Sequence, residues 1–305
     1  MTSSAPRIDV AVVHFGNEAV TERAERSVRH GLPGAPLWIV DNGDSSPVAS
    51  ALRSSTGARV LIPGRNLGYG AACNLAAREG SGEFLLFLNN DVELTPGAGE
   101  AMAAALSAEP RVAAVGPALL DARGRPTRSI ARAPTPRRVL FENLMLPRIF
   151  PGIPFFHGHH TAYLSHRRAR DVESLSGAAV MVRRRAFEEV GGFDEGFFFY
   201  AEESDLFARL RGAGWRVRFE PAARVVHHGG VASSEVGRRE LDRRLADGLR
   251  LYARKHHGRE GERRTARALR WGARIRWALA HLQPGRRGRD RRERFADPAE
   301  TARTG

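Results

Sequence analysis

An apolar stretch at 84–94 is interrupted by three oxygen-bearing side chains. Five apolar residues lead directly into Asn89, Asn90 and Asp91, after which the chain turns apolar again. A carboxylate at the end of a buried strand is costly in free energy unless a cation or a hydrogen-bond donor meets it. Proteins typically hold Mg²⁺ with one or two carboxylates together with phosphate oxygens and water. We therefore interpret this stretch as presenting oxygen atoms, above all those of Asp91, to a metal-bound diphosphate.

Three more strand-like stretches end in residues of the same kind. They are followed by HFGN (14–17), DNG (41–43) and GRNLGYG (64–70). Each of these alone is better explained as an ordinary turn. Four of them at one edge of a sheet are typical of a ligand site, because open α/β sheets bind ligands beyond the carboxyl ends of their strands. Within this group, Asp41 could accept a hydrogen bond from the imide N–H of a nucleobase.

A second cluster of acids lies in FFFYAEESDL (197–206). Glu202, Glu203 and Asp205 crowd the start of a predicted helix, where acids stabilise the first turn whatever their function. Four aromatic residues precede them, and apolar surroundings raise the pKa of a carboxyl group toward that of a general base. Both interpretations stay open. His227, which follows a later strand, is likewise either a structural residue or a metal ligand.

Alternating strands and helices must position these residues. The pattern predicts strands at 8–15, 36–42, 58–63, 83–91 and 111–120, and helices at 18–31, 47–57, 68–80 and 96–110. Such alternation is typical of βαβ units. The predicted fold class is therefore α/β, with a mostly parallel central sheet flanked by helices on both faces.

The second half of the chain is less regular. Pro, Gly, Arg and His are frequent at 121–172, which we interpret as an extended excursion over the surface. A strand at 174–184, a helix at about 202–212 and a further strand follow, and the pattern is helical from residue 235.

The composition is that of an ordinary globular protein. The chain has 305 residues, of which 42% are hydrophobic and 27% charged, and this is ample for a core. No apolar run approaches the about 20 residues that a membrane span needs, and we see no secretion signal. The single cysteine, Cys73, excludes an intrachain disulfide and a cysteine-based zinc site. We expect a cytoplasmic protein.

The net charge of +14 is concentrated in basic blocks at 123–138 and 259–305. Such blocks suggest an anionic partner, although an arginine-rich genome would give the same pattern without one. The predicted helix at 269–282 is basic and has one apolar face. That face consists of Trp271, Ile275, Ala278 and Leu282. A helix of this kind lies in a membrane surface or docks on its own domain, and in the first case the protein would be peripheral at the inner face of the membrane.

Several motifs taken together resemble one known family. They are VVHFGN with VDNGDSS, then NLGYGAACN, then FLNNDVEL, and finally a long run from SGAAVMVRR through EESDLFARLRGAGWRV to VVHHGG. Over about residues 8–232 the chain resembles the inverting nucleotide-sugar glycosyltransferases of family 2, and within them the rhamnosyltransferase-like branch. The resemblance implies the Rossmann-like GT-A fold and a dTDP- or UDP-linked sugar donor. The acceptor would be a glycan, a lipid-linked intermediate or a secondary metabolite.

The resemblance implies a donor site and a metal site. The residues near the nucleotide would be Asp41 at the base, His14 and Phe15 beside it, and Asn66, Gly70 and Asn90 near the ribose and diphosphate. Asp91 would bind Mg²⁺ or Mn²⁺, with His227 as the second protein ligand. Asn89 replaces the first Asp of the family's Asp-x-Asp motif, and we expect this to weaken metal affinity without preventing turnover.

On the acceptor side, Gly177 and Ala178 would line the site. Glu203 would be the catalytic base, and Glu202 would assist it. The family usually has Glu-Asp or Asp-Asp here, so a Glu base has an arm longer by one methylene. The cation would neutralise the leaving diphosphate while the base takes the proton of the attacking hydroxyl. One displacement of this kind inverts the anomeric configuration.

These expectations give a division into domains and leave some rivals. The GT-A domain would span 1–232, with a nucleotide-binding half at 1–120 and an acceptor-side half at 121–232. A helical extension would follow at 233–284, and a disordered basic tail at 285–305. HFGNEA after the first strand argues against a dehydrogenase, which needs Gly-x-Gly-x-x-Gly there. No nucleic-acid motif is present, so we expect no such partner. A catalytically inactive nucleotide-sugar binder and an anionic-membrane-associated protein stay open as alternatives.

Overall fold

The computed structural model describes residues 6–43, 58–159, 167–229 and 237–281. The chain divides into two compact units. Unit 1 comprises Met1–Ala131, Leu164–Phe198 and Glu202–Glu235, and unit 2 comprises Arg132–Tyr163, Phe199–Ala201 and Val236–Gly305. The predicted helix at 47–57 and the predicted tail at 285–305 lie outside the described residues.

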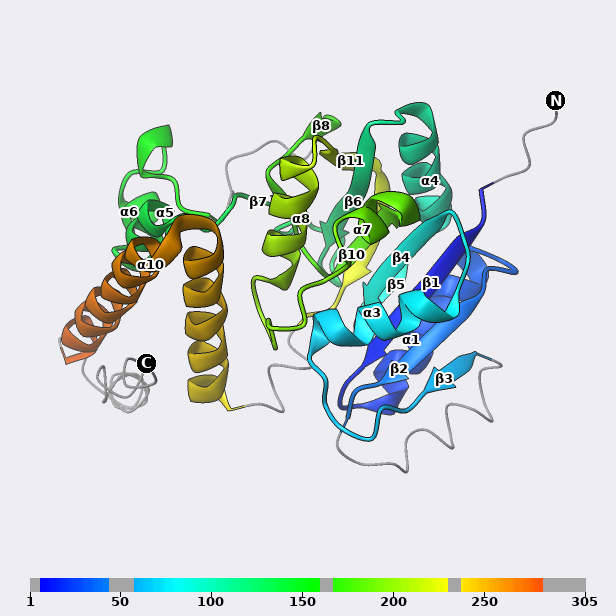
Figure 1. Cartoon of the computed structure of the whole chain (residues 1–305), viewed down its shortest axis with the longest axis horizontal. Helices are drawn as coiled ribbons and strands as arrows, with labels where there is room; N and C mark the ends of the chain where they lie inside the picture. The colour runs from blue at the N-terminus through cyan, green and yellow to red at the C-terminus, as the bar shows by residue number, and fades with distance from the viewer. Residues whose placement is uncertain (1–5, 44–57, 160–166, 230–236, 282–305) are drawn as a thin grey trace. The chain divides into compact units, whose positions relative to one another are not determined.

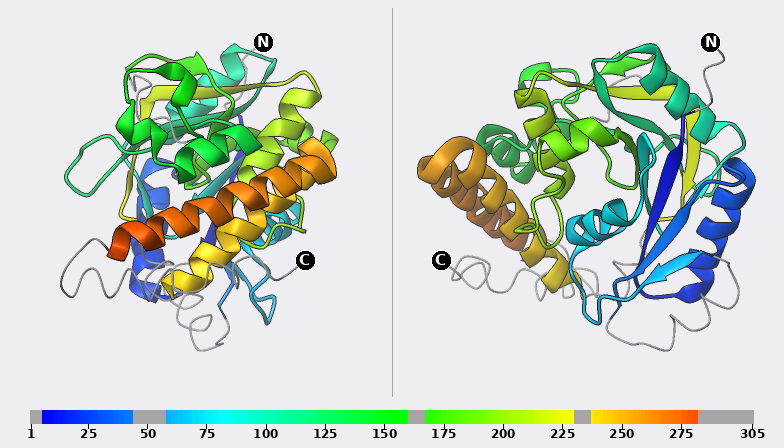
Figure 2. Two further views of the ribbon diagram at one scale, coloured as in Figure 1. Left: turned by 90° about the vertical axis from the view of Figure 1, so that its left-hand side faces the viewer. Right: turned by 45° about the vertical axis from the view of Figure 1, so that its right-hand side comes forward.

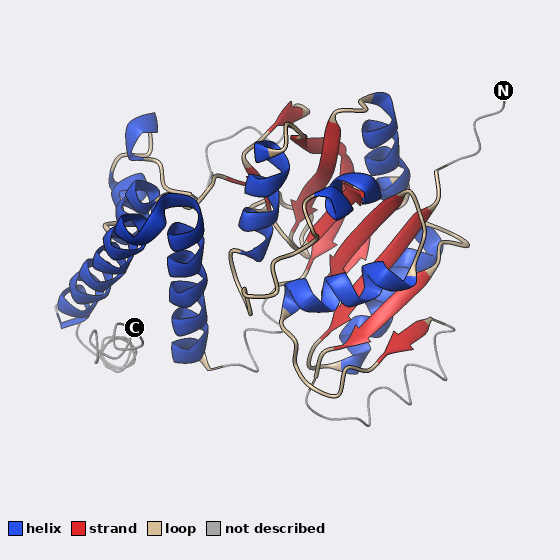
Figure 3. Cartoon of the chain, viewed as in Figure 1, coloured by secondary structure: helices blue, strands red, loops and turns tan. Residues whose placement is uncertain are grey.

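Unit 1 is built on a single mixed sheet, whose strands are red in Figure 3. Within the described residues the sheet has nine strands in the order β3-β2-β1-β4-β10-β6-β11-β5, with β8 paired to β11. Their bounds are β1 Ile8–His14, β2 Leu37–Asp41, β3 Arg59–Leu61, β4 Phe84–Asn89, β5 Val92–Leu94, β6 Val112–Leu120, β8 Arg170–Asp171, β10 Ala179–Arg183 and β11 Arg216–His227. The short strands β7 (Ile130–Ala131) and β9 (Ser174–Leu175) pair separately.

The sheet confirms the predicted α/β class and its mostly parallel strands. β1 is parallel to β2 and β4, and β6 is parallel to β11. β10 runs antiparallel to both of its neighbours, β4 and β6, which the sequence pattern did not reveal. Because β4 and β6 therefore run in the same direction, several strands finish at one edge. The residues that end β1, β2, β4 and β11 at this carboxyl edge are His14, Asp41, Asn89 and His227.

Helices cover both faces of the sheet (Figures 1 and 2). One face packs against α1 (Glu18–Gly31) and α4 (Ala98–Ala108), and the other against α3 (Tyr69–Glu79), α7 (Arg184–Glu189) and α8 (Glu202–Gly212). Successive side chains of a strand point to opposite faces, so β4 contributes Leu86 and Leu88 to one core and Leu85 and Phe87 to the other. A strand buried on both faces is apolar throughout, which is why the polar residues after it stand out in the sequence.

Unit 2 is helical in its described part. It contains α5 (Pro136–Asn143), α6 (Leu146–Ile149), the 3₁₀ turn η1 (Pro154–Phe156) and the long α10 (Arg238–His281), which packs on α5 and is broken at Gly258 with φ of 68°. The helical pattern predicted from residue 235 is confirmed from Arg238 onward, while 235 and 236 lie outside the described residues. The expectation of irregular chain throughout 121–172 is wrong, because α5 and α6 lie within it. None of the helices in the described ranges combines the length and the hydropathy that a bilayer span requires.

A buried ion pair ties the start of the sheet to α7. The Asp9 carboxylate is 2.7 Å from the Arg184 guanidinium and also accepts a hydrogen bond from the Gly82 backbone N–H, while its Oδ1 has no hydrogen-bond partner. Replacing Arg184 would leave a buried carboxylate without its cation, which is strongly destabilising.

We expect Arg184→Met to lower the free energy of unfolding by about 3 kcal/mol. The matched control is Arg78→Met, since Arg78 forms an ion pair with Glu195 in which both side chains are more than half exposed, and we expect a change below about 0.5 kcal/mol. The measurement is urea denaturation followed by circular dichroism. Equal midpoints for the two variants would contradict this account of the Asp9 pair.

Candidate active site

The parallel pairing of β1 with β2 places His14 directly beside Asp41. Both are buried, at 1% and 3% exposure, and the His14 Nδ1 lies 2.6 Å from the Thr21 hydroxyl. Burial lowers the pKa of the His14 imidazole, and the negative charge of Asp41 only partly offsets this. The predicted base-binding pair thus consists of a neutral imidazole next to a carboxyl group, on adjacent strand ends.

Asn90 holds the loop that follows β1. Its side-chain N–H₂ donates to the Phe15 carbonyl at 3.0 Å and to the Thr21 hydroxyl at 3.1 Å. The residue is only 4% exposed. Asn90, which was predicted to lie near the diphosphate, thus also fixes Phe15 and the β1–α1 connection against the end of β4.

A pair of asparagines organises the glycine-rich turn before α3. The Asn42 side-chain oxygen accepts from the Leu67 backbone N–H at 2.7 Å, and its N–H₂ donates to the Asn66 side-chain oxygen at 3.1 Å. That same oxygen accepts from the Gly68 N–H at 2.9 Å. Asn66 was a predicted site residue, whereas Asn42 was not, although its place directly after Asp41 was a usable signal.

Gly70, the other predicted residue of this turn, has a packing reason to be glycine. A methyl group added there would lie 3.0 Å from the Cβ of Phe193. Gly68 is the more constrained position: its φ is +85°, and an added methyl would lie 2.3 Å from the carbonyl oxygen of Phe198. The turn thus brings the start of α3 against the loop that precedes α8.

Asp91 and His227 come together although they are far apart in the chain. The His227 Nε2 lies 3.3 Å from Oδ1 of Asp91. Strand β5 pairs with β11 so that His227 is opposite Val92, and the His228 N–H donates to the Asp91 carbonyl at 3.0 Å. The contact therefore rests on backbone pairing and not only on side-chain rotamers.

This pair fits a divalent cation in part. Carboxylate oxygen and imidazole nitrogen are both ligands of Mn²⁺, and the carboxylate also suits Mg²⁺. Among the described residues no group of three or more His, Cys, Asp or Glu side chains could hold a metal. The two predicted ligands would accordingly be completed by diphosphate oxygens and water, as is usual for Mg²⁺ with nucleotide substrates.

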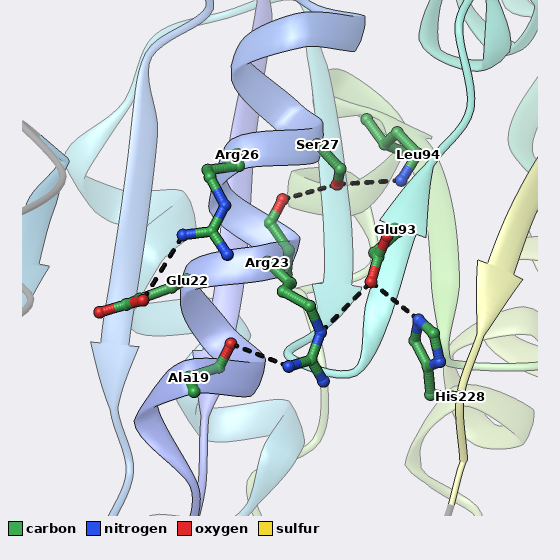
Figure 4. Close-up of polar contacts among 9 residues, drawn as sticks. Ala19, Glu22, Arg23, Arg26, Ser27, Glu93, Leu94 and His228 are labelled. Atoms are coloured by element: carbon green, nitrogen blue, oxygen red, sulfur yellow. Dashed lines mark hydrogen bonds and ion pairs between the residues drawn. The ribbon is translucent and has the colours of Figure 1, made fainter.

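A polar network supports this corner of unit 1, and Figure 4 shows it. The Glu93 carboxylate is 2.8 Å from the His228 Nε2 and 3.5 Å from the Arg23 guanidinium of α1. The Ser27 hydroxyl of α1 accepts from the Leu94 N–H at 3.0 Å. These contacts connect β5 both to α1 and to the residue that follows β11, close in sequence to Asp91 and His227.

The two acids at the start of α8 have lost much of their contact with water. Glu202 is 6% exposed and its Oε2 has no hydrogen-bond partner. Desolvation raises the pKa of Glu202 well above its usual range, with a further contribution from the neighbouring Glu203 charge. Desolvation also raises the pKa of Glu203, to about 7. A carboxyl group with such a pKa is suited to accept a proton near neutral pH.

Glu203 faces Gly177, as the predicted acceptor side requires. A methyl group added at Gly177 would lie 3.6 Å from the Cγ of Glu203. The Gly177 carbonyl accepts a hydrogen bond from the Tyr69 hydroxyl at 2.9 Å, and desolvation raises the pKa of Tyr69, with smaller contributions from Cys73 and from both acids. Tyr69 was missed because no spacing in the sequence links it to residue 177.

A backbone hydrogen bond connects the surroundings of Asp91 with those of Glu203. The Asn89 N–H donates to the Ala178 carbonyl at 2.9 Å. Asn89 lies two residues before Asp91, and Ala178 follows Gly177, which faces Glu203. The predicted site residues from β1, β2, β4 and α8 are therefore gathered around the carboxyl edge of one sheet.

Family models and known relatives that match this chain are glycosyltransferases. Residues 9–191 match the family model described as "Glycosyl transferase family 2", and residues 153–283 match "Glycosyl transferase family group 2". The N-acetylglucosaminyl-diphospho-decaprenol L-rhamnosyltransferase of Mycobacterium tuberculosis is 36% identical over 208 residues. That match covers 63% of this chain and 66% of the relative, so the chain spans slightly less than two thirds of the relative's length. Rhamnosyltransferase WbbL of Escherichia coli is 40% identical over 57 residues, 19% of this chain and 22% of that protein.

Two solved structures share the fold. The mannosyltransferase PcManGT from Pyrobaculum calidifontis, in complex with GDP-Man and Mn²⁺, superposes with a TM-score of 0.57 at 17% identity and covers 98% of this chain and 87% of its own. GalNAc-T7 with UDP, GalNAc and Mn²⁺ also gives 0.57, at 16% identity, over 73% of this chain and 43% of its own. These likenesses confirm the predicted GT-A fold.

The raised pKa of Glu203 makes stability depend on pH. The pKa of this carboxyl group is 4.5 when it is free in water, as in the unfolded chain, and desolvation raises its pKa to about 7 in the folded protein. Between these values the folded state holds the additional proton, so the free energy of unfolding falls as pH rises. Because glutamine does not titrate, Glu203→Gln should remove this decrease in the free energy of unfolding at higher pH. We expect the variant to be more stable than the parent by about 1–2 kcal/mol at pH 8, a value discounted for partial exposure, and similar to it at pH 4.5.

The matched control for that measurement is Glu79→Gln, an exposed residue of α3. Thermal and urea denaturation of the three proteins across this pH range give the comparison. A Glu203→Gln variant that shows the same pH dependence as the parent would refute the desolvated environment of the acid pair.

Proposed function

The chain belongs to glycosyl transferase family 2, and we propose that it transfers a sugar from a nucleoside-diphosphate sugar to an acceptor hydroxyl by a single inverting displacement. The observation that carries this proposal is the meeting of Asp91 and His227, at 3.3 Å, at the same sheet edge to which the pair Glu202 and Glu203 is connected. A carboxylate–imidazole pair and a desolvated carboxyl group are what metal-assisted departure and general-base catalysis require.

The donor would lie over the carboxyl ends of β1 and β2. Asp41 would accept from the imide N–H of the base, while the neutral His14 and the Phe15 ring flank it. Asn66 would lie near the ribose and Gly70 near the diphosphate. Asp91 and His227 would hold a Mg²⁺ or Mn²⁺ ion, which supplies positive charge to the departing diphosphate.

The acceptor would enter beside Gly177 and Ala178. Glu203 would take the proton of the acceptor hydroxyl as its oxygen forms a bond to the anomeric carbon, and the bond from that carbon to the diphosphate oxygen would break on the opposite side. Glu202 has the more strongly shielded carboxyl group. In its neutral form it would assist by adding no second negative charge directly beside the base.

The similarity to the mycobacterial enzyme supports rhamnose as the sugar, and dTDP as the nucleotide follows from the resemblance of the motifs. The same relative is named for a diphospho-decaprenol acceptor, so among the three acceptor classes we favour a lipid-linked one over a free glycan or a secondary metabolite.

A donor screen tests the proposed reaction. Purified protein is incubated with Mg²⁺ or Mn²⁺ and a panel of nucleotide sugars, and released nucleoside diphosphate is measured with and without a lipid-linked sugar acceptor. We expect release from dTDP-rhamnose above all others, dependence on the cation, and loss of activity on adding a chelator. Release that is insensitive to chelation would contradict the metal assignment, and no release from any donor would favour an inactive binder.

Variants separate the two halves of the mechanism. We expect Glu203→Gln to lower kcat about 10²–10⁴-fold with little change in the concentration of cation that gives half-maximal rate. Asp91→Ala and His227→Ala should raise that cation concentration by about tenfold or more. In the parent, kcat/KM should rise as pH increases through about 7, because Glu203 acts in its deprotonated form.

Glu79→Gln and His30→Ala are the matched controls, since both residues are exposed on helices of unit 1. They should leave all three quantities unchanged. Transfer that survives both Asp91→Ala and Glu203→Gln would overturn the assignment of these residues.

A further inference from the structure

An apolar turn of unit 2, residues 148–155, is exposed along its whole length. Its large hydrophobic side chains are Ile149, Phe150, Ile153 and Phe155, with exposures of 58%, 40%, 45% and 57%. Single exposed hydrophobic residues are normal, but a contiguous group marks a surface that meets a partner.

Hydrogen bonds and aromatic contacts hold the apolar turn in a defined conformation. The Ile153 N–H donates to the Phe150 carbonyl at 3.2 Å, and the His157 Nε2 donates to the Pro151 carbonyl at 2.9 Å. The Phe156 ring lies under it, with its centroid 5.0 Å from that of Phe150 and 5.3 Å from that of Phe155. The hydrophobic side chains are therefore presented outward on an aromatic base.

The backbone of this turn has few donors left for water. The N–H groups of Arg148, Ile149 and Phe150 donate to carbonyls of the preceding turn of chain. Ile153 donates as well, and positions 151 and 154 are prolines, which have no N–H. Bringing backbone into lipid is costly when its polar groups lose their hydrogen bonds. This segment has already satisfied or removed most of its donors.

Basic side chains surround the apolar turn. Arg148 begins it, and the exposed Arg137 guanidinium lies 5.2 Å from the centroid of the Phe155 ring. Arg137 also lines a groove of about 650 Å³ between α5 and the stretch of α10 that runs from His257, next to the break, to Trp271. We call this the basic groove. Its other charged and aromatic lining residues are His257, Glu260, Arg264, Arg267 and Trp271.

We propose that unit 2 binds the surface of an anionic phospholipid bilayer, with the apolar turn entering the interface and the basic groove meeting lipid phosphates. The four exposed hydrophobic side chains supply the apolar part, and arginines outnumber acids around them, which matches a negatively charged surface. A segment of eight residues is far too short to span a bilayer, so the contact is peripheral.

This surface differs from the one that the sequence predicted. In its described part the predicted face of the helix at 269–282 is divided, because Trp271 is 56% exposed whereas Ile275 is half-buried. Leu282 of that face lies outside the described residues. The buried side of this part of α10 is formed by Ala268 and Gly272. The inference goes beyond the proposed transfer reaction and does not rest on it, because vesicle binding is measured without donor or acceptor.

Sedimentation of the full chain with phospholipid vesicles tests the proposal. Vesicles of phosphatidylcholine are compared with vesicles that also contain phosphatidylglycerol. We expect binding to the anionic vesicles, weakened by salt. Ile149→Ser should lower the partition coefficient several-fold, and the double variant Phe150→Ser/Phe155→Ser by about tenfold or more. The matched control is Ile62→Ser, since Ile62 of unit 1 is 43% exposed and should leave binding unchanged.

Charge-reversal variants in the same vesicle assay test the role of the basic groove. Arg264→Glu/Arg267→Glu should reduce binding to anionic vesicles about tenfold or more, and Arg26→Glu/Arg78→Glu, in exposed arginines of unit 1, should reduce it much less. Equal effects of the two pairs would mean that only net charge matters, and that would overturn the groove's role.

Tryptophan fluorescence provides a test in which the expected result is a new signal and not the loss of binding. The parent, with its four native tryptophans including Trp271 of the basic groove, sets the background emission. Phe150→Trp should show a larger blue shift and stronger quenching by lipid-borne quenchers on anionic vesicles than the parent does, and Ile62→Trp should show no increase over the parent. Absence of vesicle binding by the parent chain refutes the proposal. Sedimentation equilibrium of the parent and of Phe150→Ser/Phe155→Ser gives a second test. A parent that is dimeric and a variant that is monomeric would also refute the proposal, because the apolar turn would then bind a second copy of the chain.

Discussion

The contact between Asp91 and His227 is the constraint on which the candidate site depends. It exists because the chain leaves β4 at Asn89, turns, and pairs its next strand with the end of β11, so that His227 lies opposite Val92. The backbone hydrogen bond from His228 to the Asp91 carbonyl fixes the same place. Because the backbone holds the carboxylate and the imidazole close together, little side-chain entropy would be lost if the proposed cation bound between them.

The carboxyl groups around the sheet edge are in two kinds of environment. Asp91 meets an imidazole and lies in a corner strengthened by the Glu93 network. Glu202 and Glu203 meet the apolar interior, and Glu202 has one oxygen with no partner at all. Desolvation raises the pKa of Glu202 and of Glu203, which suits this pair to taking up a proton near neutral pH. One sheet edge can in this way serve both the leaving diphosphate and the attacking hydroxyl.

The sequence predicted those parts of the fold that follow from local patterns. β1 and β4 are apolar because both of their faces are buried, and the polar residues after them mark the edge correctly. The antiparallel direction of β10 depends on which strands it meets, and no property of 179–183 encodes that. α5 was missed for a different reason: Thr135 caps it and Pro136 occupies its first turn, a good start signal, but the many Pro, Gly and Arg residues around it favoured an irregular interpretation.

Residue type made only part of the site predictable. Asp91, His227 and the two acids at 202–203 were singled out because they lie at strand and helix ends, where turn and helix-start explanations stayed open, and their roles were implied by the family resemblance. Asn42 and Tyr69 were not identified, because their partners, Leu67 and Gly177, are known only once the chain is folded. Asn90 shows the opposite case, since its amide nitrogen proved to hold a loop.

The surface of unit 2 follows the same logic. A helical-wheel argument assigns Trp271 and Ile275 to one face, but the face that α10 buries is set by close approach. A methyl group at Gly272 would lie 2.5 Å from the Asn143 side chain, so only glycine lets α5 pack there, and Arg276 donates to the same asparagine at 2.9 Å. α5 takes up this side of α10, while Trp271, Trp277 and Leu279 of the same helix stay exposed. The apolar turn adds further exposed hydrophobic side chains, since its prolines and internal hydrogen bonds allow large side chains to face outward on an ordered backbone.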